Sequence, residues 1–411
     1  MASYVLAVLS IIANVKAADQ LPAGRLSLAA PSLGWCLTVA LLRARGSTAL
    51  LSVLIVAQVA SVALVLRGGP AVYGSDLALR AALLPLAGTV LGGALGGLCA
   101  APPPALVVGA AASVQLWAAI AGVVMLLCYP APVVQVIQPQ AARERELAHD
   151  AQTLSGSGWS YERRLVRAPQ TGVLLDTVVL RPPHPSARWV LYAGGNAQFM
   201  ENSLPEGAYY GRQLAANVVL YNPRGVGRSS GGYVAHTSDL VEDAAAVAHH
   251  YAQTVPIAPR QLLFVGHSIG GGVVAEVAAR CFPDSSLVLD RSFSSLREAA
   301  VGFSPLSARL TQALLPLCVG DLRTMDAWYA LPHQRKMILY TRLDEILRYD
   351  LCSPARETVR DIVPRESYAS RVVELHGAGI TTWHNTALAY FAEAPRVLAT
   401  MSTFFAATDK K

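Results

Sequence analysis

The first third of the chain is poor in charge. Residues 1–135 contain eight charged side chains, about 6% of that stretch, whereas the other 276 residues contain 52, about 19%. Soluble domains average about 25% charged residues, which excludes residues 1–135 as an ordinary soluble domain. An apolar content of 53% excludes a disordered chain. We therefore expect one membrane-associated part and one globular part.

The chain also lacks paired cysteines and a strongly basic surface. None of its six cysteines falls in a Cys-x-x-Cys or metal-ligand spacing, which excludes a typical zinc site and a dense disulfide framework and favours a reducing compartment. Of the modest net charge of +6, +4 lies in residues 1–135, so no nucleic-acid footprint is indicated. We predict no metal, no cofactor and no nucleic-acid partner.

Long apolar runs occupy the charge-poor part. About 20 apolar residues are needed to cross a bilayer, and four runs approach or reach that length: Leu26–Leu42, Ser47–Leu66, Ala81–Ala101 and Ala105–Tyr129. Residues 1–135 are therefore predicted to be an all-α transmembrane module of about four spans, with the lipid bilayer as a partner. The shorter run Tyr4–Val15 fits a short span, a surface helix or a signal sequence.

The basic residues beside these runs predict an orientation. If the C-terminal part is cytoplasmic, six of them lie inside and two, Arg43 and Arg45, lie outside. Lys and Arg are enriched on the cytoplasmic side of membrane proteins. We therefore expect a multi-pass membrane protein whose C-terminal domain faces the cytoplasm.

The stretch 136–159 is predicted to be a linker. Pro130, Pro132 and Pro139 interrupt any continuing helix, and Ser155–Gly158 has the composition of a flexible hinge. The residues that follow, 160–411, have an ordinary charge content and form the predicted globular domain.

Short apolar runs alternate with helical patterns in residues 160–411. Helices are expected at Gly271–Arg280, at Asn385–Phe405 and from Asp239, whose spacing to Glu242 is that of a capping box. This alternation is typical of an α/β fold with a mainly parallel sheet flanked by helices. Strands are expected at Gly172–Arg181, Arg188–Ala193, Asn217–Tyr221, Gln261–Val265, Leu287–Leu289, Met337–Tyr340 and Val372–Leu375.

A Gly-x-Ser-x-Gly motif, Gly266–Gly270, lies between a predicted strand and a predicted helix. A nucleophile in such a sharp turn exposes its hydroxyl, and the flanking glycines let the strand and the helix approach closely. A serine needs a base to become nucleophilic. Ser268 is therefore predicted to be a catalytic nucleophile, the alternative being an ordinary glycine-rich turn.

The motifs after three predicted strands resemble those of the α/β-hydrolase superfamily: Gly194–Ala197, Tyr221–Gly231 and the Ser268 turn, followed by Asp344-Glu345-Ile346. The Asn-x-Arg-Gly stretch is similar to that of serine hydrolases that include membrane-associated depalmitoylases and related bacterial hydrolases. The resemblance covers about residues 160–408 and leaves out the apolar segment. It implies an α/β-hydrolase fold with catalytic residues in the chain order Ser, Asp, His.

The catalytic acid should follow a strand. Asp344 comes shortly after Met337–Tyr340, and the resemblance implies the acid at this Asp. Glu345 and Asp350 are the alternatives.

The catalytic base should be a histidine before the last helix. The family places it directly after Gly-x-Gly, but here Gly377–Gly379 is followed by Ile380, and the next histidine is His384. We predict His384 as the base, with His376 as the alternative. His333 precedes the acid in the chain, which disfavours it.

The oxyanion hole needs backbone N–H donors. Ile269, which follows the nucleophile, is the first predicted donor. The resemblance of the loop after the strand expected at Arg188–Ala193 implies a second donor at Asn196, with Ala197 as the further candidate. Arg224 is expected to serve turn geometry and a buried hydrogen-bond network.

Together these features predict a membrane-anchored serine hydrolase. It would cleave an acyl ester, thioester or amide through an acyl-enzyme, on a lipid, an acylated protein or a small acyl substrate. The segment 295–331 is expected to be an apolar cap over the site, or else helices packed on the core. The alternatives are a serine peptidase acting on short peptides and a non-catalytic membrane scaffold, which the displaced histidine would favour.

Overall fold

The computed structural model describes residues 128–405 except 130, 132–133, 136–137, 256, 305 and 363–370. The predicted membrane runs lie outside the described residues, apart from the last two residues of the fourth. Among the residues that are described, no helix is long and apolar enough to cross a membrane. Cys128–Ser230 and His236–Lys411 form one compact unit.

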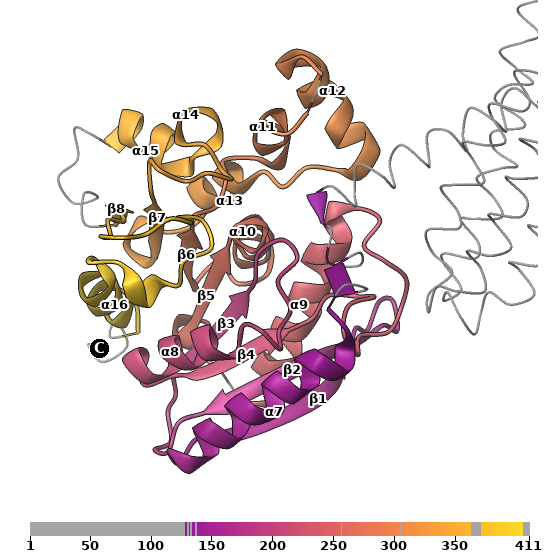
Figure 1. The fold of residues 1–411 in the computed structure, drawn as a ribbon, viewed down its shortest axis with the longest axis vertical. Helices are drawn as coiled ribbons and strands as arrows, with labels where there is room; N and C mark the ends of the chain where they lie inside the picture. The colour runs from indigo at the N-terminus through magenta and orange to yellow at the C-terminus, as the bar shows by residue number, and fades with distance from the viewer. Residues whose placement is uncertain are drawn as a thin grey trace, which may run out of the picture. The chain divides into compact units, whose positions relative to one another are not determined.

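One sheet crosses this unit in the order β1-β2-β4-β3-β5-β6-β7-β8 (Figure 1). β2 is antiparallel to both β1 and β4, and the strands from β4 to β8 are parallel to one another. The seven expected strands are confirmed, and β1 is an addition. The strands are β1 (Ser160–Arg167), β2 (Leu174–Arg181), β3 (Trp189–Ala193), β4 (Asn217–Tyr221), β5 (Leu262–His267), β6 (Ser286–Asp290), β7 (Lys336–Tyr340) and β8 (Val372–Glu374).

Helices cover both faces of the sheet. α7, α8 and α16 share one hydrophobic cluster with the strands, whereas α10 packs on β3, β5 and β6 and contacts α9 and α13. The bounds are α7 (Gln140–Gly156), α8 (Leu204–Leu214), α9 (Thr237–Thr254), α10 (Ile269–Cys281), α11 (Leu296–Val301), α12 (Ala308–Val319), α13 (Thr324–Ala330), α14 (Tyr349–Cys352), α15 (Pro354–Ile362) and α16 (Ala394–Thr403), with 3-10 turns η2 (Pro259–Gln261), η3 (His333–Arg335) and η5 (Leu388–Tyr390).

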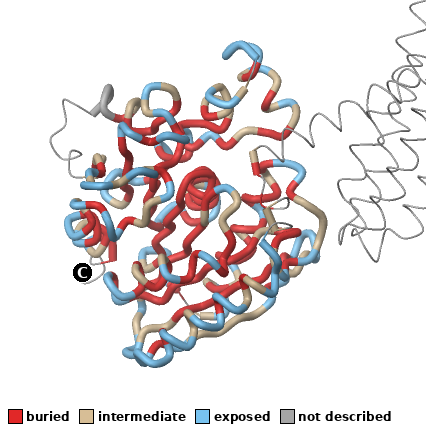
Figure 2. The backbone as a smooth tube through the Cα atoms, viewed as in Figure 1, coloured by how far each residue is buried: buried red, intermediate tan, exposed pale blue. Residues whose placement is uncertain are grey.

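The core follows the apolar runs of the sequence. Every residue of β3 to β7 is buried, and Figure 2 shows these strands and α10 in the colour of buried residues. Alternate residues of a strand face opposite sides: Val190 and Tyr192 of β3 belong to the cluster with α8 and α16. Burial on both faces explains why these strands are continuous apolar runs and do not alternate with polar residues.

The predicted linker is structured. α7 occupies most of 136–159 and packs against β1 and α8, so the expectation of a flexible hinge at Ser155–Gly158 is wrong. Leu147 and Leu154 are buried in the core, because residues seven apart share one face of a helix. That face has few apolar residues, and most of the helix is charged or polar, so the sequence shows no clear helical pattern.

Two predicted helix starts are also wrong. The N-cap of α9 is His236: its side chain accepts from the Ser238 N–H, and Asp239 accepts from the His236 N–H, so Asp239 is inside the helix. The last helix was expected from Asn385 but begins at Ala394, where Pro395 suits the first turn of a helix.

The segment 295–331 contains α11, α12 and α13. Leu296 and Trp328 are buried, and α13 packs on α10, whereas Phe303 and Leu310 are exposed. Part of the segment therefore packs on the core, which was the alternative expectation. Its role as a cap over the site stays a prediction.

Candidate active site

Ser268 lies in a strained turn between β5 and α10. Its φ of 54° and ψ of −124° are unfavourable for a residue with a side chain. A Cβ on Gly266 would overlap the backbone of Gly270, and one on Gly270 would overlap the backbone of Ala193 and Gly194 at the end of β3. The two glycines of the motif are therefore required by close backbone contacts, as the sequence predicts.

Asp344 and His384 meet at the carboxyl end of the sheet. His384 Nδ1 lies 2.8 Å from Asp344 Oδ2, and both side chains are buried. The other oxygen of Asp344 accepts the N–H groups of Ile346 and Leu347, at 2.9 and 2.6 Å. Asp344 is thereby fixed toward the imidazole, which leaves Nε2 of His384 as the ring nitrogen available for proton transfer.

The alternative residues have other partners. His376 is exposed, and its Nδ1 lies 2.9 Å from Glu393 Oε1. Asp350 is exposed and pairs with Arg348. His333 starts η3, ahead of β7. The structure therefore joins Asp344 to His384 and to none of the alternative histidines.

Glu345 holds the backbone next to the base. Its carboxylate accepts the N–H of Trp383 at 2.9 Å and the N–H of His384 at 3.2 Å. The sequence offered Glu345 only as an alternative acid. Glu345 lies 39 residues before His384 in the chain, so no local pattern indicates this role.

His267, the residue before the serine, contacts the base. Its Nε2 donates to the His384 carbonyl at 2.8 Å, and the two rings lie 5.0 Å apart. A Cβ on Gly195 would lie 2.8 Å from its Nδ1, so the loop after β3 passes on the other side. Burial lowers the pKa of His267 to about 3, with Arg291 adding to the effect. Nothing in the sequence assigns His267 a role beyond its place in the motif.

This pKa predicts a pH dependence of stability. An unfolded histidine titrates near 6.5, so below that pH the unfolded chain binds a proton that folded His267 refuses until about pH 3. The free energy of unfolding should therefore fall with decreasing pH in this window, by up to about 1.4 kcal/mol per pH unit from this residue. Urea unfolding at several pH values between 6 and 4 measures this effect. The free energy of unfolding should change less steeply with pH in His267→Gln than in the wild type. An equal slope would contradict a neutral buried His267.

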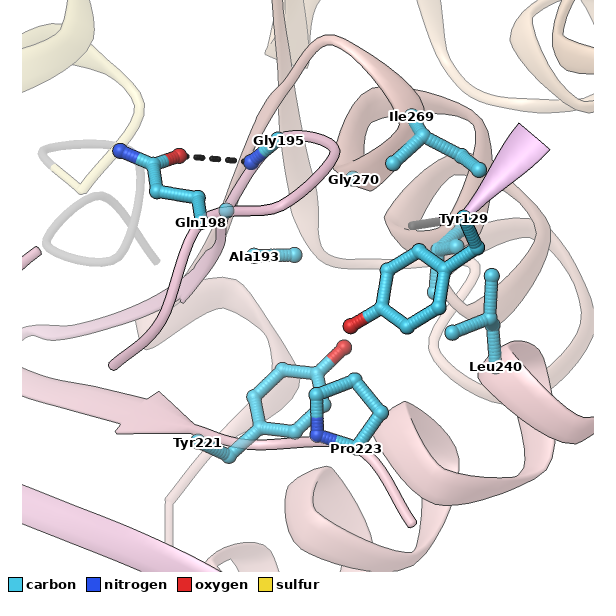
Figure 3. Close-up of a pocket in the computed structure, with 11 residues that line it drawn as sticks. Tyr129, Ala193, Gly195, Gln198, Tyr221, Pro223, Leu240, Ile269 and Gly270 are labelled. Carbon is cyan, nitrogen blue, oxygen red and sulfur yellow. Dashed lines mark hydrogen bonds between the residues drawn. The ribbon is translucent and has the colours of Figure 1, made fainter. Parts of the chain in front are cut away.

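Of the predicted oxyanion donors, Ile269 directly follows the serine. Ile269 is the first residue of α10, where backbone N–H groups have no partner within the helix. In the loop after β3, the Gly195 N–H donates to Gln198 Oε1 at 2.6 Å (Figure 3). Asn196 is exposed and Ala197 has a φ of 59°. Both follow Gly195, which lies beside Ser268; their roles as donors stay predictions.

A small pocket adjoins this loop and the start of α10. Figure 3 shows the hydroxyl groups of Tyr129 and Tyr221 directed toward each other in it, below Ile269 and beside Ala193. Its wall is mainly apolar apart from these hydroxyls. Within the ranges that the structure describes, no group of three or more His, Cys, Asp or Glu side chains could hold a metal ion.

Arg224 organises the turn after β4, as predicted. Its guanidinium binds Asp243 at 2.8 Å and Asp239 at 2.9 Å, and its N–H donates to Asp243 at 2.7 Å. Asp243 is completely buried. The network ties the loop after β4 to α9.

Comparisons with known proteins found one family model and several solved structures. Residues 210–337, which include Ser268, match the model of a hydrolase family described as serine aminopeptidase, S33. The chain is similar to an α/β hydrolase from Vibrio vulnificus (18% identity, 62% of this chain and 83% of that one, TM-score 0.42). It is also similar to an esterase from Pyrococcus furiosus (16% identity, 54% of this chain and 82% of that one, TM-score 0.39). A third similar structure is oligopeptidase B from Leishmania major (14% identity, 61% of this chain and 37% of that one, TM-score 0.40).

Similarities of this size do not indicate a substrate. The sheet order, the strained serine after β5 and the pairing of Asp344 with His384 are features of this chain itself. Together with the family match, they support a hydrolase of the α/β-hydrolase superfamily.

Proposed function

We propose that the chain is a serine hydrolase that cleaves an acyl ester, thioester or amide through an acyl-enzyme. The observation that carries the proposal is the 2.8 Å contact between His384 and Asp344, at the same edge of the sheet as the strained Ser268. A nucleophile, an oriented base and free N–H groups at a helix start are the parts that acyl transfer needs.

The proposed reaction has two halves. Ser268 Oγ attacks the acyl carbonyl while His384 Nε2 takes its proton, and Asp344 stabilises the resulting imidazolium. The tetrahedral oxyanion accepts N–H bonds from Ile269 and from the loop after β3. His384 then protonates the leaving group, and the acyl group stays on Ser268. Water, deprotonated by His384, releases the carboxylic acid and restores the serine.

Stopped-flow kinetics with p-nitrophenyl butyrate test this proposal. A burst of p-nitrophenol equal to the enzyme concentration is expected, because the acyl-enzyme should form faster than water hydrolyses it. The burst should vanish in Ser268→Ala. A chain that releases no p-nitrophenol faster than buffer would favour the non-catalytic scaffold.

A peptidase is the second candidate, which the description of the matched family favours. An aminoacyl p-nitroanilide distinguishes it from an acyl hydrolase. We expect kcat/KM for the butyrate ester, measured relative to the uncatalysed rate, to exceed that for the anilide. The opposite ranking would assign the site to short peptides.

We further propose that residues 1–135 anchor the enzyme in a membrane, with the hydrolase domain in the cytoplasm. The four apolar runs and the asymmetry of basic residues support this proposal. Anchoring would place lipids and acylated proteins near the site at high local concentration.

Alkaline carbonate extraction of cell membranes tests the anchor. The full chain is expected in the pellet, with a peripheral membrane protein released as the control. Protease added to the cytoplasmic side should digest the domain after Arg143. A chain released by carbonate would contradict the anchor, and a protected domain would contradict the orientation.

A further inference from the structure

The proposed base lies on a loop without regular structure. β8 ends at Glu374 and η5 begins at Leu388, so His384 is carried by a stretch with neither helix nor strand. The position of its imidazole must therefore depend on side chains that bind the loop, since displacement of a catalytic group by about 1 Å can cost about 100-fold in rate.

Arg291 binds this loop on both sides of His384. Its Nη1 donates to the carbonyl of Trp383 at 3.0 Å and to the carbonyl of Thr386. Its guanidinium also lies over the ring of Phe391, 5.1 Å from the ring centre, so it contacts the chain beyond the loop too. The Arg291 side chain is 1% exposed.

The neighbouring residue holds the guanidinium in place. Nε and Nη2 of Arg291 each donate to one oxygen of Asp290 at 2.8 Å. Burial alone would raise the pKa of Asp290, but Arg291 outweighs it and keeps that pKa below its ordinary value. Arg291 has a φ of 43°, a conformation that costs a residue with a side chain free energy. The fold therefore bends the backbone after β6 to direct this guanidinium toward the loop.

Residues 290–292 also bind the backbone of the nucleophile. The Ser268 N–H donates to the carbonyl of Asp290 at 3.0 Å, and the Ser292 hydroxyl donates to the carbonyl of Ser268 at 2.7 Å. Residues 290–292 thus contact the backbone of the serine on one side and the loop of the base on the other. A rigid connection between the two is the arrangement that proton transfer requires.

We propose that Arg291 is a positioning residue that sets the place of His384 relative to Ser268. The inference rests on the proposed function. Arg291 contacts neither reacting atom; it acts through the two carbonyls that flank the base and through its attachment to the serine turn. Its planar guanidinium can bind a carboxylate with two nitrogens while the third binds both carbonyls, which the single ammonium of a lysine cannot do.

The test compares Arg291→Lys with Arg335→Lys in the full chain. Lysine keeps the positive charge beside Asp290, which avoids leaving a buried carboxylate unpaired. Arg335 is a matched control, because it too donates to backbone carbonyls, those of Asp284, Arg260 and Phe404. It lies before β7, at the amino ends of the strands and thus at the edge opposite the site.

With p-nitrophenyl butyrate, Arg291→Lys is expected to lower kcat about 100-fold and to leave KM within about threefold. Arg335→Lys should leave both within about threefold. Hydrogen exchange of the peptide covering 376–388 should rise in Arg291→Lys and not in Arg335→Lys, while the peptide covering α10 stays protected.

Equal kcat values for the two variants, or unchanged exchange around His384, would overturn the positioning role. If Arg291→Lys lowered kcat but raised hydrogen exchange throughout the domain, α10 included, Arg291 would have a general structural role, and the positioning role would be overturned as well. A wild-type chain without esterase activity would contradict the proposed function, and hydrogen exchange would still decide whether Arg291 holds the loop.

Discussion

The His384→Ala variant is expected to lose at least about 10⁴-fold in kcat, whereas His376→Ala should stay within about threefold of the wild type. Only His384 has a buried carboxylate partner, Asp344, at 2.8 Å. His376 is exposed and bound to Glu393 at the start of α16. Removal of a member of such a triad abolishes the action of the whole unit. Both variants would be assayed with p-nitrophenyl butyrate at equal concentrations of folded protein.

The two variants serve as controls for each other, because each removes one imidazole from the same stretch of chain after β8. If His376→Ala caused the larger loss in kcat, the contact between His384 and Asp344 would be structural. Equal losses would indicate that the two variants disturb the loop and not the base.

The Ser268→Ala variant is also expected to lose most of its activity. Its kcat should fall by about 10⁴-fold or more, because no other group can form the acyl-enzyme. Its free energy of unfolding should stay near that of the wild type, because the change removes one oxygen atom from a buried side chain. Thermal unfolding and the ester assay together measure both quantities.

Ser285→Ala is the matched control for this variant. Ser285 is also a buried serine, 1% exposed, but it precedes β6 and so lies at the amino ends of the parallel strands. Its kcat should be unchanged within about threefold. A Ser268→Ala variant that keeps more than a few per cent of wild-type kcat would remove Ser268 from the mechanism.

Much of the fold can be predicted from local pattern. The buried strands are continuous apolar runs, and the Gly266–Gly270 motif marks the sharp turn, because both signals lie within a few neighbouring residues. α7 escapes prediction because its apolar face is limited to a few residues such as Leu147 and Leu154. Pro395 could have corrected the start of α16, since proline favours the first turn of a helix.

The site is less predictable, because its contacts join distant parts of the chain. Asp344 and His384 follow from chain order and resemblance, but the choice between His384 and His376 needed the position of the carboxylates. The loop-binding roles of His267, Glu345 and Arg291 had no signal in the sequence: each binds backbone atoms of residues 383–386 from tens of residues away. Backbone carbonyls and N–H groups are present at every residue, so no motif reports such contacts.

In the proposed mechanism, Ser268 is a nucleophile activated by His384. Labelling of the full chain with a fluorophosphonate, followed by mass spectrometry of its peptides, tests it most directly, because the probe forms a covalent bond only with an activated serine. One adduct is expected, on the peptide that contains Ser268, with a labelling rate much reduced in His384→Ala and unchanged in His376→Ala. An adduct on another serine, or equal labelling of the wild type and Ser268→Ala, would contradict it.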